Sequence, residues 1–384
     1  MTRRMILPLF FATLWAAPLS AQAPADPGKP KDESAETVDG VKLSCRFYQA
    51  QGEGNGSVVI MVHDLNADPK KGDWDGLART IATKGFNVMR FDFRGHGDSK
   101  EIIPDKFWKD NRNQNLVTGN GRNPPKSTIE VKDFRQGYVT TLISDLAAVR
   151  CALDLKNDDK KVNTRSIYII ASGSAAPIVQ AFIATEWHRP QIKPAPIGLT
   201  GTIVLDTVSA NSRRMNGTEV AGVDYAGLIY LSPTRNYTYP QGTSVGKASF
   251  GDQNLRDWVS RYSRDSQGGA ELRRSTSLLV LYGDKDPDNM PAPKEAGFFY
   301  NDLMSADGKK SPVLEPMRNS KFIPIKNAKE KGVDLLGKNN SYKTEDYIVA
   351  FLEKVEGDRK RLNPIDRKYD KPFKINWNSF NLGG

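Results

Sequence analysis

The stretch that most constrains this chain is an apolar run followed by a crowded set of very small residues. Residues 167–171 read Ile-Tyr-Ile-Ile-Ala, and residues 172–176 read Ser-Gly-Ser-Ala-Ala. β-Branched and aromatic residues in a row, without polar alternation, are typical of a strand buried on both faces of a parallel sheet. Apolar residues at helical spacing follow between Ile178 and Ile183. The stretch therefore predicts a buried strand, a cramped turn and a helix.

Strands and helices alternate along the rest of the chain, which indicates a mostly parallel α/β sheet. The predicted strands lie at 38–48, 57–62, 86–91, 167–170, 226–231, 277–282 and 322–325, and the predicted helices lie around 74–81, 142–153, 178–183, 255–262 and 347–355. Each βαβ unit adds one parallel strand and covers one face with a helix. The sequence thus favours a doubly wound sheet.

Two irregular insertions interrupt this alternation, at about 100–137 and 189–225. Both are too long for plain connections, and we expect them to cover the carboxyl edge of the sheet, where ligands of such folds bind. The domain itself is predicted to span residues 38–356. A polar, proline-bearing leader over 24–37 is predicted to be disordered, and a basic, polar tail follows over 357–384.

The N-terminus has the pattern of a secretory signal peptide. Arg3 and Arg4 precede an apolar run from Met5 to Trp15, and Ala21-Gln22-Ala23 is a small-x-small cleavage site. We expect residues 1–23 to be removed after export to the periplasm or the outside of the cell. No later apolar run reaches the ~18 residues of a membrane span, so no stable membrane anchor is predicted.

Composition excludes several other classes of function. The net charge is +10 at pH 7, but Lys and Arg are scattered among acids and form no basic stripe, so no nucleic acid is expected as a partner. Three dispersed histidines and two cysteines give no metal-ligand spacing, and no glycine-rich phosphate loop follows a strand. We therefore predict no metal and no cofactor. Cys45 and Cys151 either pair in an exported protein or remain buried thiols.

Signatures at the predicted strand ends resemble the α/β-hydrolase fold, in its lysophospholipase and serine-aminopeptidase-like branch. Residues 91–99, Phe-Asp-Phe-Arg-Gly-His-Gly-Asp-Ser, closely match the D-x-R-G-H-G-x-S turn, which is the most specific of these motifs. Residues 59–63 look like the strand leading to the oxyanion loop, residues 172–176 like the nucleophile elbow, and residues 283–286 like the G-x-x-D acid loop. The resemblance covers roughly residues 38–356 and implies a mostly parallel sheet with helices on both faces.

The resemblance leaves the nucleophile ambiguous. Matching G-x-S-x-G to the strand places Gly173, not a serine, at the catalytic position. A shift by one residue offers Ser174, whose neighbours are small enough for the strained turn. A shift the other way offers Ser172, but bulky Ile170 then occupies a position that must be small. Ser174 is the serine candidate, and a vestigial turn that packs helix on strand is the alternative.

The predicted oxyanion region is also altered. With Ser174 as nucleophile, the resemblance implies that this region comprises His63, Asp64 and Ala175. The family carries His-Gly where this chain carries His63-Asp64. A carboxylate close to a developing oxyanion opposes the charge that the hole must stabilise.

The chain has a residue at the family's acid position but no histidine at the position of the family's base. Asp286 stands at the family's acid position, although it could merely cap the turn before Pro287. No histidine follows Asp286, and Lys329 or Glu330 stands near the place of the family's G-x-x-H-G histidine. The chain's histidines are His63, His96 and His188. None is well placed as a base, and without one a serine hydroxyl is a poor nucleophile.

Two functions follow from these patterns. The first is an exported α/β-hydrolase-fold protein, a catalytically degenerate pseudoenzyme, that acts by binding a small-molecule or ester-like ligand or a protein partner that the sequence does not identify. The second is a secreted serine hydrolase, of esterase, lipase or peptidase type, that uses Ser174 and Asp286 with an unidentified base. A base within hydrogen-bond reach of Ser174 would distinguish them.

Overall fold

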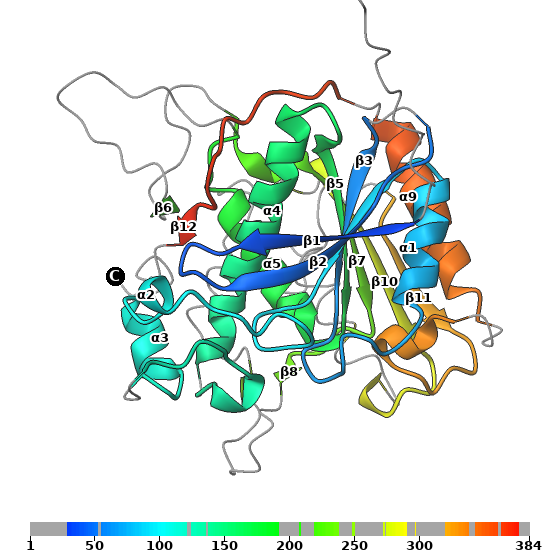
Figure 1. The fold of residues 1–384 in the computed structure, drawn as a ribbon. Helices are drawn as coiled ribbons and strands as arrows, with labels where there is room; N and C mark the ends of the chain where they lie inside the picture. The colour runs from blue at the N-terminus through cyan, green and yellow to red at the C-terminus, as the bar shows by residue number, and fades with distance from the viewer. Residues whose placement is uncertain are drawn as a thin grey trace, which may run out of the picture.

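The architecture is described from a computed structural model, in which an eight-stranded sheet separates two layers of helices (Figure 1). In spatial order the strands are β1 (Pro30–Glu36), β2 (Lys42–Tyr48), β4 (Asn87–Phe91), β3 (Ser57–Val62), β5 (Asn163–Ser172), β7 (Tyr225–Leu231), β10 (Ser277–Gly283) and β11 (Lys321–Ile325). β2 is the antiparallel strand, and the other seven are parallel to one another. This sheet has the order of the α/β-hydrolase fold, so the predicted fold class is confirmed.

The structure describes most of the chain but not all of it. The described residues are 29–52, 55–120, 124–135, 137–191, 207–208, 219–237, 248–249, 272, 274–289, 296, 319–337, 342–359 and 362–375. The predicted signal peptide, the predicted helix at 255–262 and much of the predicted insertion at 189–225 lie outside them. Two short pairs complete the strands: β6 (Thr207–Val208) with β12 (Lys374–Ile375), and β8 (Asn236–Tyr237) with β9 (Ala248–Ser249).

Helices cover both faces of the sheet, as predicted. The α-helices are α1 (Trp74–Thr83), α2 (Pro104–Phe107), α3 (Asn111–Leu116), α4 (Ile143–Asp158), α5 (Ala176–Glu186) and α9 (Thr344–Arg359). Short 3₁₀ turns are η1 (Val131–Asp133), η2 (Tyr138–Leu142), η3 (Gly173–Ala175), η5 (Ala221–Asp224), η7 (Pro287–Asn289) and η8 (Gly332–Leu335). α1 and α9 lie on one face, and α4 and α5 lie on the other (Figure 1). No helix within the described ranges is long and apolar enough to cross a membrane.

β5 is the centre of the sheet and is buried on both faces. Ile167 and Ile169 pack into the core that α4 and α5 cover, whereas Tyr168 and Ile170 pack into the core beneath α1 and α9. This explains why its sequence lacks polar alternation. Because β5 is held between β3 and β7, the turn that follows it is fixed at the carboxyl edge of the sheet.

The prediction of a disordered leader is wrong for residues 30–36, which form β1. This strand pairs along its whole length with β2 at the edge of the sheet. Its sequence, Pro-Lys-Asp-Glu-Ser-Ala-Glu, has no hydrophobic period, and Ala35 is its one buried apolar side chain. Backbone hydrogen bonds hold an edge strand whatever its side chains, and charges there discourage further strand pairing. A pattern of hydrophobic residues therefore could not reveal it.

The two cysteines lie apart from each other. Cys45 is on β2 and Cys151 is on α4, and both are buried free thiols. Burial raises the pKa of each thiol to about 12. Of the two alternatives left by the sequence, the unpaired one is therefore observed.

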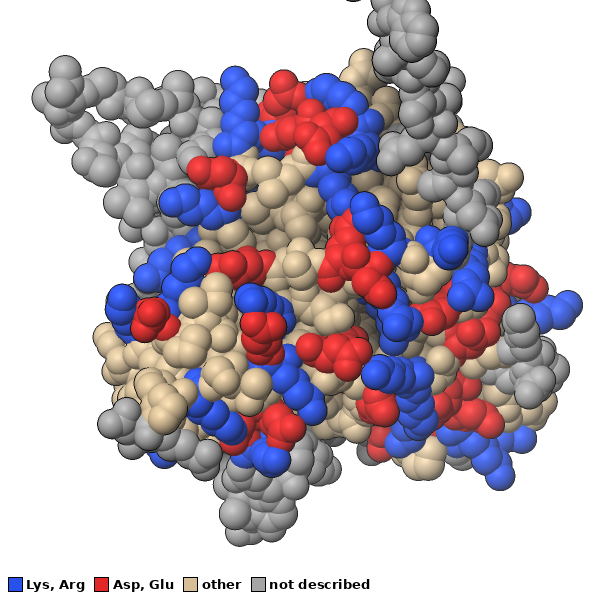
Figure 2. All heavy atoms as spheres, in the orientation of Figure 1, with Lys and Arg blue, Asp and Glu red and all other residues tan. Residues whose placement is uncertain are grey.

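The surface mixes charges of both signs. On the face in Figure 2, blue Lys and Arg side chains lie beside red Asp and Glu side chains, with uncharged areas between them. Many of these are ion pairs across segments, such as Lys156 with Glu33 at 2.7 Å and Lys106 with Glu36 at 2.6 Å. Basic residues that are scattered along the sequence thus lie next to acidic residues in the fold.

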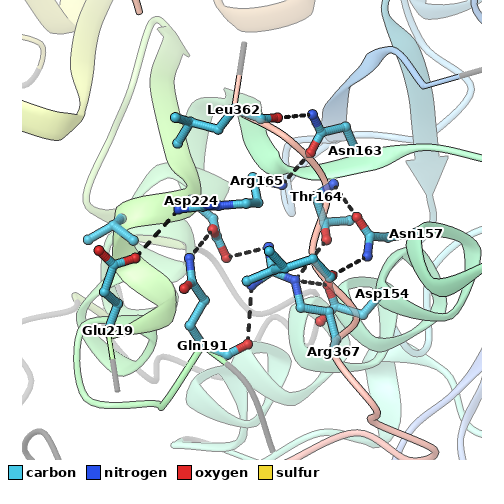
Figure 3. Close-up of polar contacts among 12 residues, drawn as sticks. Asp154, Asn157, Asn163, Thr164, Arg165, Gln191, Glu219, Asp224, Leu362 and Arg367 are labelled. Carbon is cyan, nitrogen blue, oxygen red and sulfur yellow. Dashed lines mark hydrogen bonds and ion pairs between the residues drawn. The ribbon is translucent and has the colours of Figure 1, made fainter. Parts of the chain in front are cut away.

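The C-terminal segment after α9 packs against the domain through a buried charge cluster. The cluster balances three arginines against three carboxylates: Arg150, Arg189, Arg367, Asp154, Glu186 and Asp224. Arg367 lies 3.1 Å from Asp224 and donates to the backbone oxygen of Gln191, as Figure 3 shows. Phe373 stacks on Phe182 of α5. The polar composition of the tail concealed this attachment.

Removing the charge of Arg367 should destabilise the protein strongly. Arg367→Met leaves the three buried carboxylates of the cluster facing two cations, and breaking one partner of a buried ion pair costs about 3–5 kcal/mol. Urea unfolding of the variant measures the loss. Lys371→Met is the matched control, because Lys371 is exposed and should change the free energy of unfolding by less than about 0.5 kcal/mol. Equal effects of the two substitutions would contradict a role for the cluster.

Candidate functional site

The turn after β5 has the geometry of a nucleophile elbow, with glycine at its strained position. β5 ends at Ser172, the 3₁₀ turn η3 carries Gly173 to Ala175, and α5 begins at Ala176. Gly173 has φ +54°, whereas Ser172 before it is extended. A side chain disfavours this left-handed backbone. The register is therefore the one that places Gly173, not Ser174, at the apex.

The carboxylate of Asp64 occupies the space that a side chain at position 173 would need. A Cβ atom built on Gly173 would lie 2.0 Å from Oδ2 of Asp64. No larger residue fits the apex while Asp64 keeps this position. Asp64 comes from the loop after β3, which lies beside β5 in the sheet.

The same carboxylate takes the hydrogen bonds that an oxyanion would take. Oδ1 of Asp64 accepts the backbone N–H of Ser174 at 3.2 Å, the backbone N–H of Asn66 at 3.0 Å and the hydroxyl of Ser174 at 2.6 Å. In this fold the oxyanion hole comprises the N–H after the nucleophile and an N–H from the loop after β3. With Gly173 at the apex, these donors belong to Ser174 and Asn66. The predicted contribution of Ala175 is therefore replaced by that of Ser174.

Ser174 is fully buried, as are Gly173 and Ala175, its neighbours in the turn. Its hydroxyl donates to Asp64 and accepts a hydrogen bond from the side-chain amide of Asn66 at 3.1 Å. Asn66 was not among the predicted residues. The only sequence signal for it was its place two residues after Asp64, in the predicted oxyanion loop.

His63 supports the loop and holds no free nitrogen toward the elbow. Its Nδ1 lies 2.9 Å from the backbone oxygen of Asp64, and its Nε2 accepts the backbone N–H of Phe93 at 3.0 Å. The second contact requires an unprotonated Nε2, which assigns the neutral tautomer with a proton on Nδ1. Burial, helped by neighbouring His96, lowers the pKa of His63 well below its usual value. This ring is a neutral structural link between two strand ends.

The other two histidines lie in structural positions too. The Nδ1 of His96 lies 3.0 Å from the backbone oxygen of Arg94 within the R-G-H-G turn, and burial lowers the pKa of the imidazole. His188 is buried just beyond the end of α5, a helix that begins at the elbow and runs away from it.

Asp286 sits at the carboxyl end of β10 and pairs with a lysine. Its Oδ1 accepts the backbone N–H of Asp288 at 3.0 Å, its Oδ2 accepts the amide of Asn289 at 2.9 Å, and Lys331 Nζ lies 3.3 Å from Oδ1. The sequence left two hypotheses for Asp286, a turn cap and a triad acid. In the structure Asp286 caps its own turn and also faces the loop that follows β11.

Lys331, and neither Lys329 nor Glu330, is the residue that the loop after β11 brings to Asp286. Lys329 is exposed, and Glu330 accepts a hydrogen bond from the Tyr342 hydroxyl at 2.7 Å. The signal that could have found Lys331 is Gly332, because the family motif has glycine directly after its histidine. A Cβ on Gly332 would lie 2.5 Å from Oγ of Ser172, so this loop packs on the elbow.

Lys331 is held as a cation rather than as a base. Partial burial lowers the pKa of its ammonium group, but the hydrogen bond to Asp288 and the charges of Asp286 and Asp288 outweigh burial, and the net shift is upward. The ammonium lies 2.6 Å from Asp288. A lysine acts as a general base only when its pKa is depressed. Among the described residues, the partners of Ser174 and of Asp286 thus include neither an imidazole nor a neutral amine.

The described residues hold no group of three or more His, Cys, Asp or Glu side chains arranged to bind a metal ion. The chemistry available at the elbow is that of carboxylates, an amide, a hydroxyl and an ammonium group.

Comparison with known proteins finds similarity to solved structures alone. No protein-family model matches the sequence, and no curated protein matches it. Similar solved structures include esterase 2 of Thermogutta terrifontis, which is 11% identical, with 90% of this chain and 100% of that one covered and a TM-score of 0.45. An esterase of Pyrococcus furiosus is 15% identical, with 85% of this chain and 92% of that one covered and a TM-score of 0.44. Another is DcsB, solved with a substrate analogue, which is 12% identical, with 85% of this chain and 99% of that one covered and a TM-score of 0.46. These values carry no inference about chemistry; the strand order and the geometry of the elbow identify the α/β-hydrolase fold.

Gly173→Ala should expose the conflict between position 173 and Asp64. The substitution combines an unfavourable φ with a steric clash, and we expect a loss of roughly 2–4 kcal/mol in the free energy of unfolding. In an Asp64→Ala background the clash is gone, so the same substitution should lower the free energy of unfolding by at least about 1 kcal/mol less than it does in the native protein. Gly357→Ala in α9, where nothing obstructs a methyl group, is the control and should be neutral or slightly stabilising. Additive effects of the Asp64 and Gly173 substitutions would rule out the contact.

The neutral state of His63 predicts an acid-sensitive stability. Its pKa is lowered in the folded protein, so the unfolded chain takes up the proton first and stability falls as the pH drops below about 6.5. Compared with His63→Gln, the native protein should lose about 1 kcal/mol more between pH 7 and pH 5.5. Urea unfolding at both pH values measures the difference, to which other titrating groups contribute equally in the two proteins. Parallel pH profiles would show that His63 is not held neutral.

Proposed function

We propose that this chain is an exported α/β-hydrolase-fold protein with a degenerate catalytic triad, which acts by binding rather than by hydrolysis. The observation that carries the proposal is the position of Asp64. Its carboxylate fills the space of a nucleophile side chain at Gly173 and accepts both backbone N–H groups that would stabilise an oxyanion. An anion held there by the chain itself opposes a second one.

The acid side of the site supports the same proposal. In a working triad the acid orients an imidazole that takes the proton of the nucleophile. Here Asp286 holds Lys331, whose ammonium also pairs with Asp288. Nucleophile, oxyanion hole and base thus depart from the serine-hydrolase arrangement together, and one loss of selection for hydrolysis accounts for all three. The export signal predicted at residues 1–23 supports a binding function in the periplasm or outside the cell.

The ligand of such a protein would bind at the carboxyl edge of the sheet. Ligands of open α/β sheets bind outside the carboxyl ends of their strands, and the loops after β3, β5 and β10 meet there. Fold alone does not determine the ligand. The polar groups that this edge presents suit a small molecule with hydroxyl, amide or ester groups.

One observation favours a second function, that of a serine hydrolase. The hydroxyl of Ser174 lies 2.6 Å from Oδ1 of Asp64, which is the geometry of a base that removes its proton. Against it, Ser174 is fully buried, and carboxylates are much weaker bases than imidazole. A working Ser174 also requires the carboxylate to leave the two backbone N–H groups.

Labelling with a fluorophosphonate probe, together with a panel of short to long acyl esters, tests the proposal. We expect the native protein to show neither labelling nor turnover above the Ser174→Ala variant. Labelling that disappears in Ser174→Ala would overturn the proposal and establish the serine hydrolase instead.

Restoring the three departures should create a reactive site. The variant Asp64→Gly/Gly173→Ser/Lys331→His places a serine at the strained apex, clears the oxyanion donors and supplies an imidazole beside Asp286. We expect this variant to be labelled by the probe. The matched control Asp64→Gly/Gly173→Ser, which keeps Lys331, should be labelled at least tenfold more slowly, because general-base catalysis contributes about 10²–10⁴-fold. A folded triple variant without labelling would count against Gly173 as the apex of the elbow.

A further inference from the structure

The turn from Asp92 to Ser99, after β4, is the most specific motif of the sequence. Most of its polar side chains form contacts that stabilise the fold. Arg94 pairs with Asp145 at 2.7 Å within the core. The hydroxyl of Ser99 donates to the backbone oxygen of Asp92 and accepts the backbone N–H of Ser44. These contacts tie the turn to α4 and β2. The side chain of Asp92 has no comparable partner.

Asp92 is a nearly buried carboxylate that forms no ion pair within the described part of the chain. The residue is 8% exposed, and Oδ2 accepts one backbone N–H, from Asp98 at 3.0 Å. No cationic side chain among the described residues lies within ion-pair distance of it. Burial raises the pKa of the carboxyl group, and the charges of Arg90 and Lys70, which lie beyond ion-pair distance, only partly oppose this shift. A charge buried in this way is costly unless a cation accompanies it.

Asp92 lines a cavity of about 290 Å³ at the carboxyl end of β4. The cavity lies between β2, β4 and the loop that precedes α1, and its polar lining includes Ser44, Arg46, Lys70, Asp73 and Arg90. Its size is at the lower limit of small-molecule sites, with room for roughly ten water-sized groups.

The three cations around this cavity are each paired with an acid. Arg46 and Arg90 both pair with Asp75, at 3.2 and 2.6 Å, and Arg46 also lies 3.5 Å from Asp32. On the other side, Lys70 lies 3.4 Å from Asp98 at the surface.

Asp73 is the second acid of the lining that no cation accompanies. Its side chain caps α1 by accepting the backbone N–H of Gly76 at 2.9 Å. Within the described part of the chain it forms no ion pair. The lining therefore keeps two carboxylates, Asp73 and Asp92, for a positive ligand.

We propose that this cavity binds the primary ammonium group of a small organic amine, with Asp92 as its counter-ion. An ammonium group donates three hydrogen bonds, and the lining offers the carboxylates of Asp92 and Asp73 and the hydroxyl of Ser44. A calcium ion takes six to eight oxygen ligands, and no group of three or more His, Cys, Asp or Glu side chains among the described residues is placed to hold a metal ion. Arg46 and Arg90 line the same cavity and repel a second positive charge, so a monoamine fits better than a diamine.

The test is calorimetric titration of the purified protein with propylammonium, with propanol and propionate as neutral and anionic analogues of the same size. We expect saturable binding of propylammonium alone. Asp92→Asn keeps an acceptor for the Asp98 N–H and should weaken binding at least tenfold. Asp73→Asn, which keeps the helix cap, should weaken it several-fold. Asp98→Asn is the control, since Asp98 lines the cavity but already pairs with Lys70, and should change affinity less than threefold.

Thermal unfolding of the same variants gives an independent readout. Asp92→Asn should raise the melting temperature in the absence of amine, because it removes a buried charge that no direct ion pair balances. Added propylammonium should stabilise the native protein but not this variant. Absence of saturable binding to the native protein, or equal affinity for Asp92→Asn, would overturn the proposal. Tighter binding of propionate would assign the cavity to anions through Arg46, and competition by calcium or magnesium would assign it to a metal ion. None of these outcomes depends on whether the elbow is catalytic.

Discussion

The burial of β5 on both faces is the constraint on which the rest of the structure depends. A strand with apolar side chains on each side must be covered by a helical layer on each face and by a strand along each edge, and β3, β7, α4, α5, α1 and α9 supply these covers. The strand then ends at a fixed height, and the small residues after it have to turn within the space left by the loop of the neighbouring β3. The position of the elbow is thus a consequence of packing and not of its own sequence alone.

Within that space, one carboxylate determines what the elbow can do. Oδ1 of Asp64 joins the loop after β3 to the turn after β5 through two hydrogen bonds from Ser174, and accepts a third from Asn66 of its own loop. One of these bonds satisfies the backbone N–H of Ser174 just before α5, which stabilises the turn. The same arrangement fills the place of a nucleophile side chain and of an oxyanion. An element that stabilises the fold therefore also explains why the proposed function is binding.

Charge follows two different rules in this molecule. At the surface, acids and bases lie side by side in pairs that contribute little individually. In the interior, Arg150, Arg189 and Arg367 meet an equal number of carboxylates, and the balance attaches the C-terminal segment to α4 and α5. Asp92 breaks the interior rule, since it is nearly buried beside a cavity and forms no direct ion pair with a cation among the described residues. That exception, rather than the size of the cavity, is what indicates a ligand.

The sequence by itself determined the fold class, the strand–turn–helix elbow and the place of Asp286 at the end of β10, because each depends on local patterns of apolar, small and turn-forming residues. It also identified Asp64 as incompatible with an oxyanion. Only the tertiary structure decided that Gly173 is the apex, that Asp64 points into it, and that Lys331 rather than Lys329 or Glu330 reaches Asp286. It alone showed that residues 30–36 form an edge strand and that Arg367 enters the core. These features rest on contacts between segments far apart in the chain, made through backbone hydrogen bonds and buried ion pairs, which leave no hydrophobic period to read.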